Sequence, residues 1–283
     1  MHERGEYNRI VVVGHSLGSV IGYDLIKRLW QEYHEQYPAL AIPETQALVR
    51  ALMERKGEGP QHALRDQISF AGEALKEDCG ADRVKQFQDT QNDVFMELQT
   101  FGNPWRISDF ITLGSPLAHA MMLLADSKDD FELRKHQREF PTCPPQRDAK
   151  GYAFSGATPV DIGDGKKFTP LFLHHAAPFA ATRWTNLYFP ARGGIFGDIV
   201  GGPLQPELGP GIRDVRVWSQ SLSKFGNHTL LSHTHYWDQT HFTQSPTLER
   251  EPYISLDVLR QTLAMTRGRH PVTCTKERMR TNR

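Results

Sequence analysis

Ser16 stands between two glycines in the stretch Gly14-His15-Ser16-Leu17-Gly18, which fits the pattern Gly-x-Ser-x-Gly. A serine hydroxyl becomes a nucleophile when a histidine takes its proton and a carboxylate orients that histidine. In this pattern the serine lies on a sharp turn from strand to helix. We expect that the positions of Gly14 and Gly18 both require glycine, because only a residue without a Cβ lets the strand and the helix approach closely. The Leu17 amide then lies at a helix N-terminus, where it can donate to a developing oxyanion. The alternative is a glycine-rich turn with an incidental serine, although chance predicts only about 0.1 such matches.

The segments on both sides of Ser16 fit such a turn. The run Val11 to Val13 is typical of a short strand buried on both faces of a parallel sheet. Residues 19–30 carry apolar side chains at helical spacing and predict a helix.

The stretch VVVGHSLGSVIGYDLI resembles the α/β-hydrolase family, in its serine esterase and lipase branch. The resemblance implies an α/β fold with a mostly parallel sheet, and catalytic residues in the chain order serine, acid, histidine. Three more strands must then follow the nucleophile. We assign them to Trp105–Pro116, where Phe110, Ile111 and Leu113 are the buried part, to Arg183–Pro190, and to Ile212–Trp218 as the last strand. The turn TLGSP after the first of these also matches esterases of this branch, and residues 117–125 predict the next helix.

The resemblance assigns the acid to Asp198. Related esterases often read Trp-x-Asn-x-Tyr in the strand before the acid, and Trp184 to Tyr188 matches this pattern. The alternative is a turn aspartate among glycines. Asp161 and Asp164 are rival acids, but they precede the predicted strand instead of following it.

The histidine is assigned in the same way. Related esterases place it in a short His-Ser/Thr-x-Tyr-Trp segment after the last strand, and His233 occupies that first position in SHTHYW. His235 is the alternative, two residues further on. The pair His174-His175 is most simply explained as a strand end or a pocket wall.

A metal site is a separate hypothesis for the same region. His228, His233, His235 and His241 fall within fourteen residues, and a His-x-His pair can chelate a divalent ion. No cysteine lies close by, and His233 is already assigned as the histidine that takes the proton of Ser16. We therefore predict no metal and no cofactor.

Length and composition limit the number of domains and the classes of partner that this chain can have. The 283 residues, 39% of them hydrophobic, predict a single domain over 1–283, with a helical insertion at 38–104 and a lid-like or cap-like excursion at 126–178. Thirty-three basic and thirty-three acidic residues cancel, which argues against nucleic acid or an anionic membrane as a partner. The three cysteines are far apart and argue against a disulfide framework. With no apolar run long enough to span a membrane and no signal-like start, we expect a cytoplasmic location; the oligomeric state stays open.

These residues predict hydrolysis of a small-molecule or lipid acyl ester through an acyl-enzyme. Two alternatives remain. The same three residues can serve an acyltransferase, in which an alcohol replaces water as the acceptor of the acyl group. Analysis of the products formed with added alcohols would distinguish the two activities. A catalytically silent interaction protein can retain such a turn, and it would not react with a fluorophosphonate probe.

Ser16 lies closer to the start of the chain than the family resemblance predicts. In the α/β-hydrolase family the nucleophile follows the fifth strand, so four strands, on the order of 80 to 100 residues, should precede Val11. The ten residues MHERGEYNRI cannot supply them. We therefore expect this chain to be the C-terminal portion of a longer enzyme, lacking the early loop that donates the second oxyanion N–H and exposing the edge of the strand at Val11. Expressed alone, it should be poorly soluble and nearly inactive. In-frame coding sequence upstream of Met1 would test this expectation.

Overall fold

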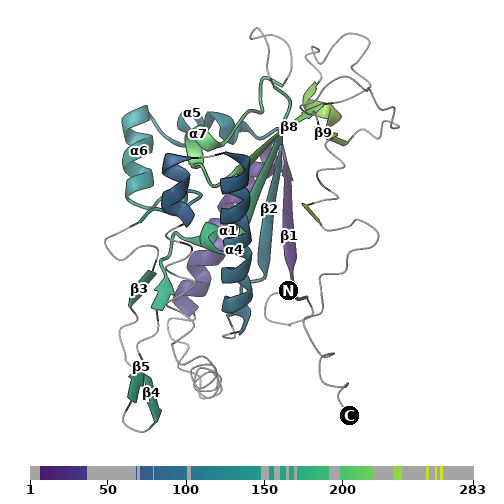
Figure 1. The fold of residues 1–283 in the computed structure, drawn as a ribbon. Coiled ribbons are helices and arrows are strands. Elements are labelled where there is room, and N and C mark those ends of the chain that lie inside the picture. The colour runs from purple at the N-terminus through teal and green to yellow at the C-terminus, as the bar shows by residue number, and fades with distance from the viewer. Residues whose placement is uncertain are drawn as a thin grey trace, which may run out of the picture.

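A parallel sheet forms the centre of the structure (Figure 1). Its strands lie in the order β1 (Ile10–His15), β2 (Ile107–Leu113), β7 (Arg183–Tyr188), β8 (Arg213–Trp218) and β9 (Tyr253–Ile254), and every neighbouring pair is parallel. The computed structural model describes residues 7–36, 68, 71–78, 80–100, 103–147, 153–155, 160–163, 166–168, 171–190, 198–218, 232–237, 253–254, 259 and 262–263. The expected α/β class with a parallel sheet is confirmed.

The strand β1 is less buried than its valines predict. It lies at the edge of the sheet as far as the described residues extend, and the Val13 side chain is 43% exposed. The prediction of a strand buried on both faces is therefore wrong for this part of the structure. An edge strand has a neighbouring strand on one side only, so its side chains are covered less completely than those of β2, all of which are buried.

The helix α1 (Leu17–Gln36) begins directly after Ser16 and runs longer at both ends than the predicted 19–30. Its buried residues Tyr23, Ile26 and Trp30 pack over β1 and β2. At Gly22 a Cβ would lie 2.8 Å from the ring of Phe110, so a glycine at this position allows α1 to lie close to β2.

The helix α4 (Ala81–Thr100) packs against β7 and β8, and it lies inside the predicted helical insertion at 38–104. Its residues Val84, Phe87 and Phe95 are buried in the same hydrophobic cluster as the inner side of α1. The side-chain amide of Gln91 donates to the carbonyl oxygens of Phe179, at 2.6 Å, and Thr182, at 3.0 Å. This buried amide fixes the segment that enters β7.

The sheet has a separate hydrophobic cluster on each face, because successive side chains of a strand point to opposite faces. Phe110 and Trp184 belong to the cluster shared with α1 and α4, whereas Ile111 and Leu187 belong to a second cluster that includes Tyr236. The sheet therefore has a buried cluster on each face.

Several smaller elements differ from the predictions. Residues 117–125, predicted as one helix, form the 3₁₀ helix η1 (Pro116–His119) followed by α5 (Ala120–Leu124). Ser115 caps η1 by accepting from the Leu117 N–H, and the proline starts a tight first turn. The strand at 212–218 is not the last, because the two-residue β9 follows and pairs with β8.

Further elements lie outside the central sheet. The excursion at 126–178 contains α6 (Lys128–His136) and two small antiparallel sheets, formed by β3 (Ala153–Ser155) with β6 (Leu171–Leu173) and by β4 (Val160–Gly163) with β5 (Lys166–Phe168). Three short helices also flank the sheet strands: the 3₁₀ helix η2 (Pro178–Ala180) precedes β7, α7 (Gln205–Leu208) precedes β8, and the 3₁₀ helix η4 (Ser232–Trp237) follows β8 in the chain. No helix among the described residues is long and apolar enough to cross a membrane.

The two glycines around Ser16 have different roles. A Cβ at Gly14 would lie 2.6 Å from Ser19 Cα and 2.7 Å from the Gly18 carbonyl oxygen, so the backbone itself fills that space. At Gly18 a Cβ would meet nothing within 4 Å. The expectation that both positions must lack a Cβ is therefore confirmed for Gly14 and wrong for Gly18, which already lies inside the first turn of α1.

This difference gives a matched pair of variants. We expect Gly14→Ala to lower the free energy of unfolding by about 1–3 kcal/mol, because the clash is with backbone atoms that cannot rotate away. Gly18→Ala should leave it unchanged or raise it by up to about 1 kcal/mol, because alanine favours a helix over glycine. Urea unfolding followed by circular dichroism measures both. Equal losses in the two variants would show that the turn at Ser16 does not depend on the close approach at Gly14.

Candidate active site

Ser16, His233 and Asp198 meet at the carboxyl ends of the strands. The Nε2 atom of His233 lies 2.8 Å from Ser16 Oγ, and its Nδ1 atom lies 3.0 Å from each carboxylate oxygen of Asp198. The structure therefore brings together the three residues that the sequence singles out. With Nδ1–H donating to Asp198, neutral His233 leaves Nε2 free to accept the Ser16 proton.

The backbone at Ser16 is strained in the way that the sequence pattern predicts. Its φ of +54° lies in the left-handed region, which costs a non-glycine residue roughly 1–3 kcal/mol. The Ser16 N–H donates to the Leu113 carbonyl at 3.0 Å, which continues the ladder between β1 and β2 through the turn. The hydroxyl is thus held at a fixed point above the sheet.

Buried hydrogen bonds support this turn from below. The Ser19 hydroxyl lies 2.6 Å from the Ser16 carbonyl oxygen, to which it donates, and 2.6 Å from the Ser115 hydroxyl. Ser115 in turn accepts from the Leu117 N–H at 3.2 Å. Since Ser19 and Ser115 are fully buried, this chain ties the turn after β2 to the turn that carries Ser16.

The carboxylate of Asp198 is fully buried and surrounded by donors. Its Oδ1 atom accepts from the backbone N–H groups of Val200 and Gly201, both at 2.9 Å. Its Oδ2 atom accepts from the Tyr236 hydroxyl at 2.7 Å. A buried carboxylate needs such partners, and here they also fix the side of Asp198 that faces His233.

Tyr236 is a site residue that sequence reasoning missed. Its fully buried hydroxyl donates to Asp198 and accepts from the Phe189 N–H at 3.0 Å. Burial, together with the neighbouring carboxylate, raises the pKa of Tyr236 well above its ordinary value, so the phenol stays a donor. The segment SHTHYW contains this tyrosine, but nothing in the spacing indicates that its hydroxyl reaches back to the acid.

Two glycines make room for the histidine and the acid. Gly114, with φ of +52°, follows β2, and a Cβ there would lie 2.6 Å from the Tyr236 ring, 2.7 Å from Asp198 Oδ2 and 3.0 Å from His233 Nδ1. A Cβ at Gly201 would lie 2.6 Å from Asp198 Oδ2 and from Gly114 Cα. Any larger residue at either position would push into the contact between His233 and Asp198.

Asn186, in the middle of the Trp-x-Asn-x-Tyr pattern, anchors the loop that carries Asp198. Its amide donates to the Gly202 carbonyl at 2.9 Å and to Asp214 Oδ1 at 2.7 Å, while its oxygen accepts from Thr112 at 2.9 Å. Burial raises the pKa of Asp214, although N–H groups at the start of α7 and the Asn186 amide oppose that effect. Asn186 therefore fixes the Asp198 loop against three strands.

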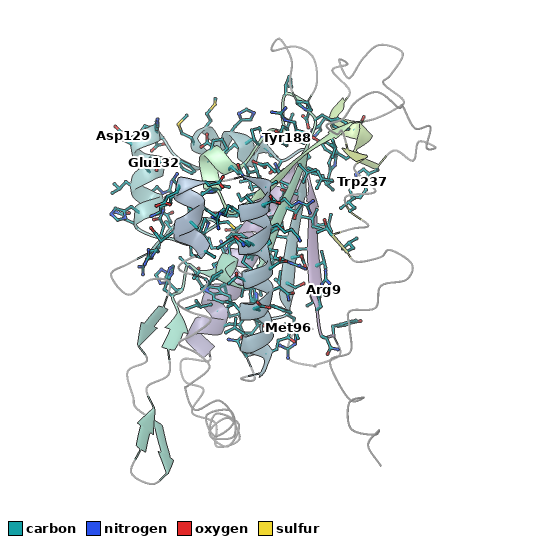
Figure 2. The ribbon with its side chains drawn as sticks, viewed as in Figure 1. Arg9, Met96, Asp129, Glu132, Tyr188 and Trp237 are labelled. Atoms are coloured by element: carbon teal, nitrogen blue, oxygen red, sulfur yellow. The ribbon has the colours of Figure 1, made fainter. Side chains whose placement is uncertain are left out.

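The site lies at one end of the sheet. Figure 2 shows Tyr188 and Trp237 near the carboxyl ends of the strands, whereas Arg9 and Met96 lie toward the opposite end. The N–H of Leu17, the first residue of α1, is one of the groups that a helix leaves without an intrahelical acceptor, as an oxyanion donor requires.

The other candidates are placed elsewhere or lie outside the described residues. Asp161 belongs to the separate β4 and β5 sheet, and Asp164 lies outside the described residues. His174 follows β6 at a strand end and is buried, with Nε2 2.8 Å from the Gln146 carbonyl oxygen. The side chain of His235 lies outside the described residues, as do His228 and His241, so the proposed histidine cluster stays untested.

Comparison with family models, with curated proteins and with solved structures found no match for this chain. Among the described residues, no group of three histidine, cysteine or acidic side chains is arranged to hold a metal ion. The chemical interpretation therefore depends on the geometry of Ser16, His233 and Asp198.

The buried hydroxyl of Tyr236 gives a stability prediction. We expect Tyr236→Phe to lower the free energy of unfolding by about 1–3 kcal/mol, because Asp198 and the Phe189 N–H each lose a buried partner. Tyr188→Phe is the matched control, since the Tyr188 hydroxyl accepts from Arg216 at 3.1 Å and water can replace that exposed guanidinium. Denaturant unfolding compares the two, and an equal loss in both would contradict the role given to Tyr236.

Proposed function

We propose that this chain is a serine hydrolase that cleaves carboxylic esters, on a fold of the α/β-hydrolase kind. One observation carries the proposal: Ser16 Oγ and Asp198 lie on opposite sides of His233, each within hydrogen-bonding distance of a different ring nitrogen. The strained Ser16 backbone between β1 and α1 supports the same proposal, because backbone strain of this kind concentrates at functional sites.

In the acylation step, Ser16 Oγ attacks the ester carbonyl carbon while its proton passes to His233 Nε2. The imidazolium that forms is stabilised by the Asp198 carboxylate through Nδ1–H. The Leu17 N–H donates to the oxygen that becomes negative in the tetrahedral intermediate. Collapse of this intermediate breaks the bond to the alcohol, which leaves with the proton from Nε2, and the acyl group stays on Ser16.

Deacylation repeats the sequence with water. His233 Nε2 takes a proton from water as the oxygen attacks the acyl carbon, and the second tetrahedral intermediate again places its charge near the Leu17 N–H. The bond to Ser16 Oγ then breaks, and Nε2 returns the proton to that oxygen. The products are a carboxylic acid and the free serine.

The nucleophile is tested by Ser16→Ala. We expect the rate of hydrolysis of short p-nitrophenyl esters to fall at least about a thousandfold, because only binding and oxyanion contributions remain. Circular dichroism should show an unchanged fold, since the substitution removes only the hydroxyl and adds no atom. Ser127→Ala is the control, because Ser127 caps the exposed start of α6, away from the site. Wild-type activity in Ser16→Ala would defeat the proposal.

The histidine assignment is tested by a second pair. We expect His233→Ala to lower the same rate by orders of magnitude and His235→Ala to lower it much less, because His233 already makes the contacts with Ser16 and Asp198. Steady-state kinetics on both variants decides between them. A larger loss in His235→Ala would mean that the register of this segment is wrong by two residues.

A further inference from the structure

His15 is the last residue of β1, directly before Ser16, and the mechanism above gives it no role. Its Nε2 atom lies 2.9 Å from the backbone carbonyl oxygen of His233. Its ring stacks on the His233 ring, with centroids 5.1 Å apart and planes at 29°, and it lies against the rings of Tyr236, at 5.7 Å, and Trp237, at 6.2 Å. A residue of the nucleophile turn thus touches the histidine segment in two ways.

The hydrogen bond has only one direction. A carbonyl oxygen is an acceptor, so Nε2 of His15 must carry the proton and donate. This bond joins the His15 side chain to the backbone of a residue 218 positions further along the chain. Because His15 directly precedes Ser16, the bond connects the backbone of His233 to the residue next to the nucleophile.

The segment that carries His233 depends on side chains for its position. It is the 3₁₀ helix η4 (Ser232–Trp237), which forms no strand pairing in the part of the chain that the structure describes. The Tyr236 hydroxyl attaches η4 on the side of the acid, through Asp198 and the Phe189 N–H. The His15 bond attaches it on the side of Ser16.

We infer that His15 is a positioning residue: its Nε2–H holds the His233 backbone against the nucleophile turn and so sets the distance from His233 Nε2 to Ser16 Oγ. This inference depends on the proposed function for its kinetic consequence. Without the bond, the Tyr236 hydroxyl still attaches η4 at Asp198, but the His233 ring can move relative to both Ser16 and Asp198. The proton transfer at Ser16 then becomes slower, because small misplacements of a catalytic group lower the rate of the chemical step.

The stacked rings make a second, weaker contribution. The χ2 torsion of histidine is broad, so the plane of the His233 ring is not fixed by its own torsional preference. The hydrogen bonds to Asp198 and the His15 ring restrict it from two directions. Substitutions at position 15 can separate the effect of the N–H donor from the effect of the ring.

The test uses two replacements of similar shape. His15→Gln keeps an N–H donor on a flexible side chain, and His15→Met has nearly the same length but no donor; both lose the ring. For p-nitrophenyl acetate hydrolysis, we expect kcat to fall about 10- to 30-fold in His15→Met and to stay within about threefold of wild type in His15→Gln, with KM changed less than twofold in both. His136→Ala, at the exposed end of α6, is the control.

A wild-type kcat in His15→Met, or equal losses in the two variants, would overturn the inference. If His15→Met does not fold, His15→Phe, which keeps a ring but has no donor, replaces it in the comparison with His15→Gln. Thermal unfolding of each variant shows that the assay contains folded protein.

A second readout does not need activity. The proton shared by His233 Nδ1 and Asp198 gives a low-field NMR resonance when it is protected, and we expect that resonance to persist in His15→Gln and to broaden in His15→Met. If wild-type protein shows no hydrolysis that depends on Ser16, the proposed function fails, and this resonance alone decides whether His15 positions His233. An unchanged resonance in His15→Met would then contradict the inference.

Discussion

The backbone at Ser16 changes from strand to helix within one residue, and the rest of the site is arranged around that turn. A φ of +54° is unfavourable for serine, so the surrounding structure must hold it. It is held by the contact of Gly14 with the Ser19 backbone, by the hydrogen bond to Leu113, and by the buried Ser19 and Ser115 hydroxyls. These contacts link the turn to β2, and a parallel sheet then places the loops after β2, β7 and β8 at the same edge.

The second constraint is the burial of Asp198. A carboxylate without solvent is costly unless donors surround it, and here two backbone N–H groups, a phenol and an imidazole do so. The same donors hold the histidine segment to the sheet, because Tyr236 and His233 both belong to η4. Stability and the geometry of the site therefore depend on the same few bonds, which explains why glycines stand where a Cβ would separate them.

Local sequence patterns predicted much of this structure. Apolar runs and periodicity predicted the strands β2, β7 and β8 and the helix α1. The serine pattern predicted Ser16, and the resemblance of two later segments to serine esterases pointed to Asp198 and His233, which meet it. Contacts between distant segments were not predictable. Tyr236 reaches Asp198, and His15 reaches the His233 carbonyl, only because the fold brings their segments together. The exposure of Val13 and the open space at Gly18 depend on neighbours in space, which no local pattern reports.

The central claim is that Ser16 is a nucleophile activated by His233, and a covalent adduct tests it most directly. The folded protein is treated with a fluorophosphonate, digested with trypsin, and the modified residue is located by fragmentation mass spectrometry. The peptide IVVVGHSLGSVIGYDLIK contains Ser16 and the buried Ser19, so fragmentation must separate the two. The account predicts one phosphonyl group, on Ser16. An adduct on another residue, or no adduct on the folded protein, would contradict it.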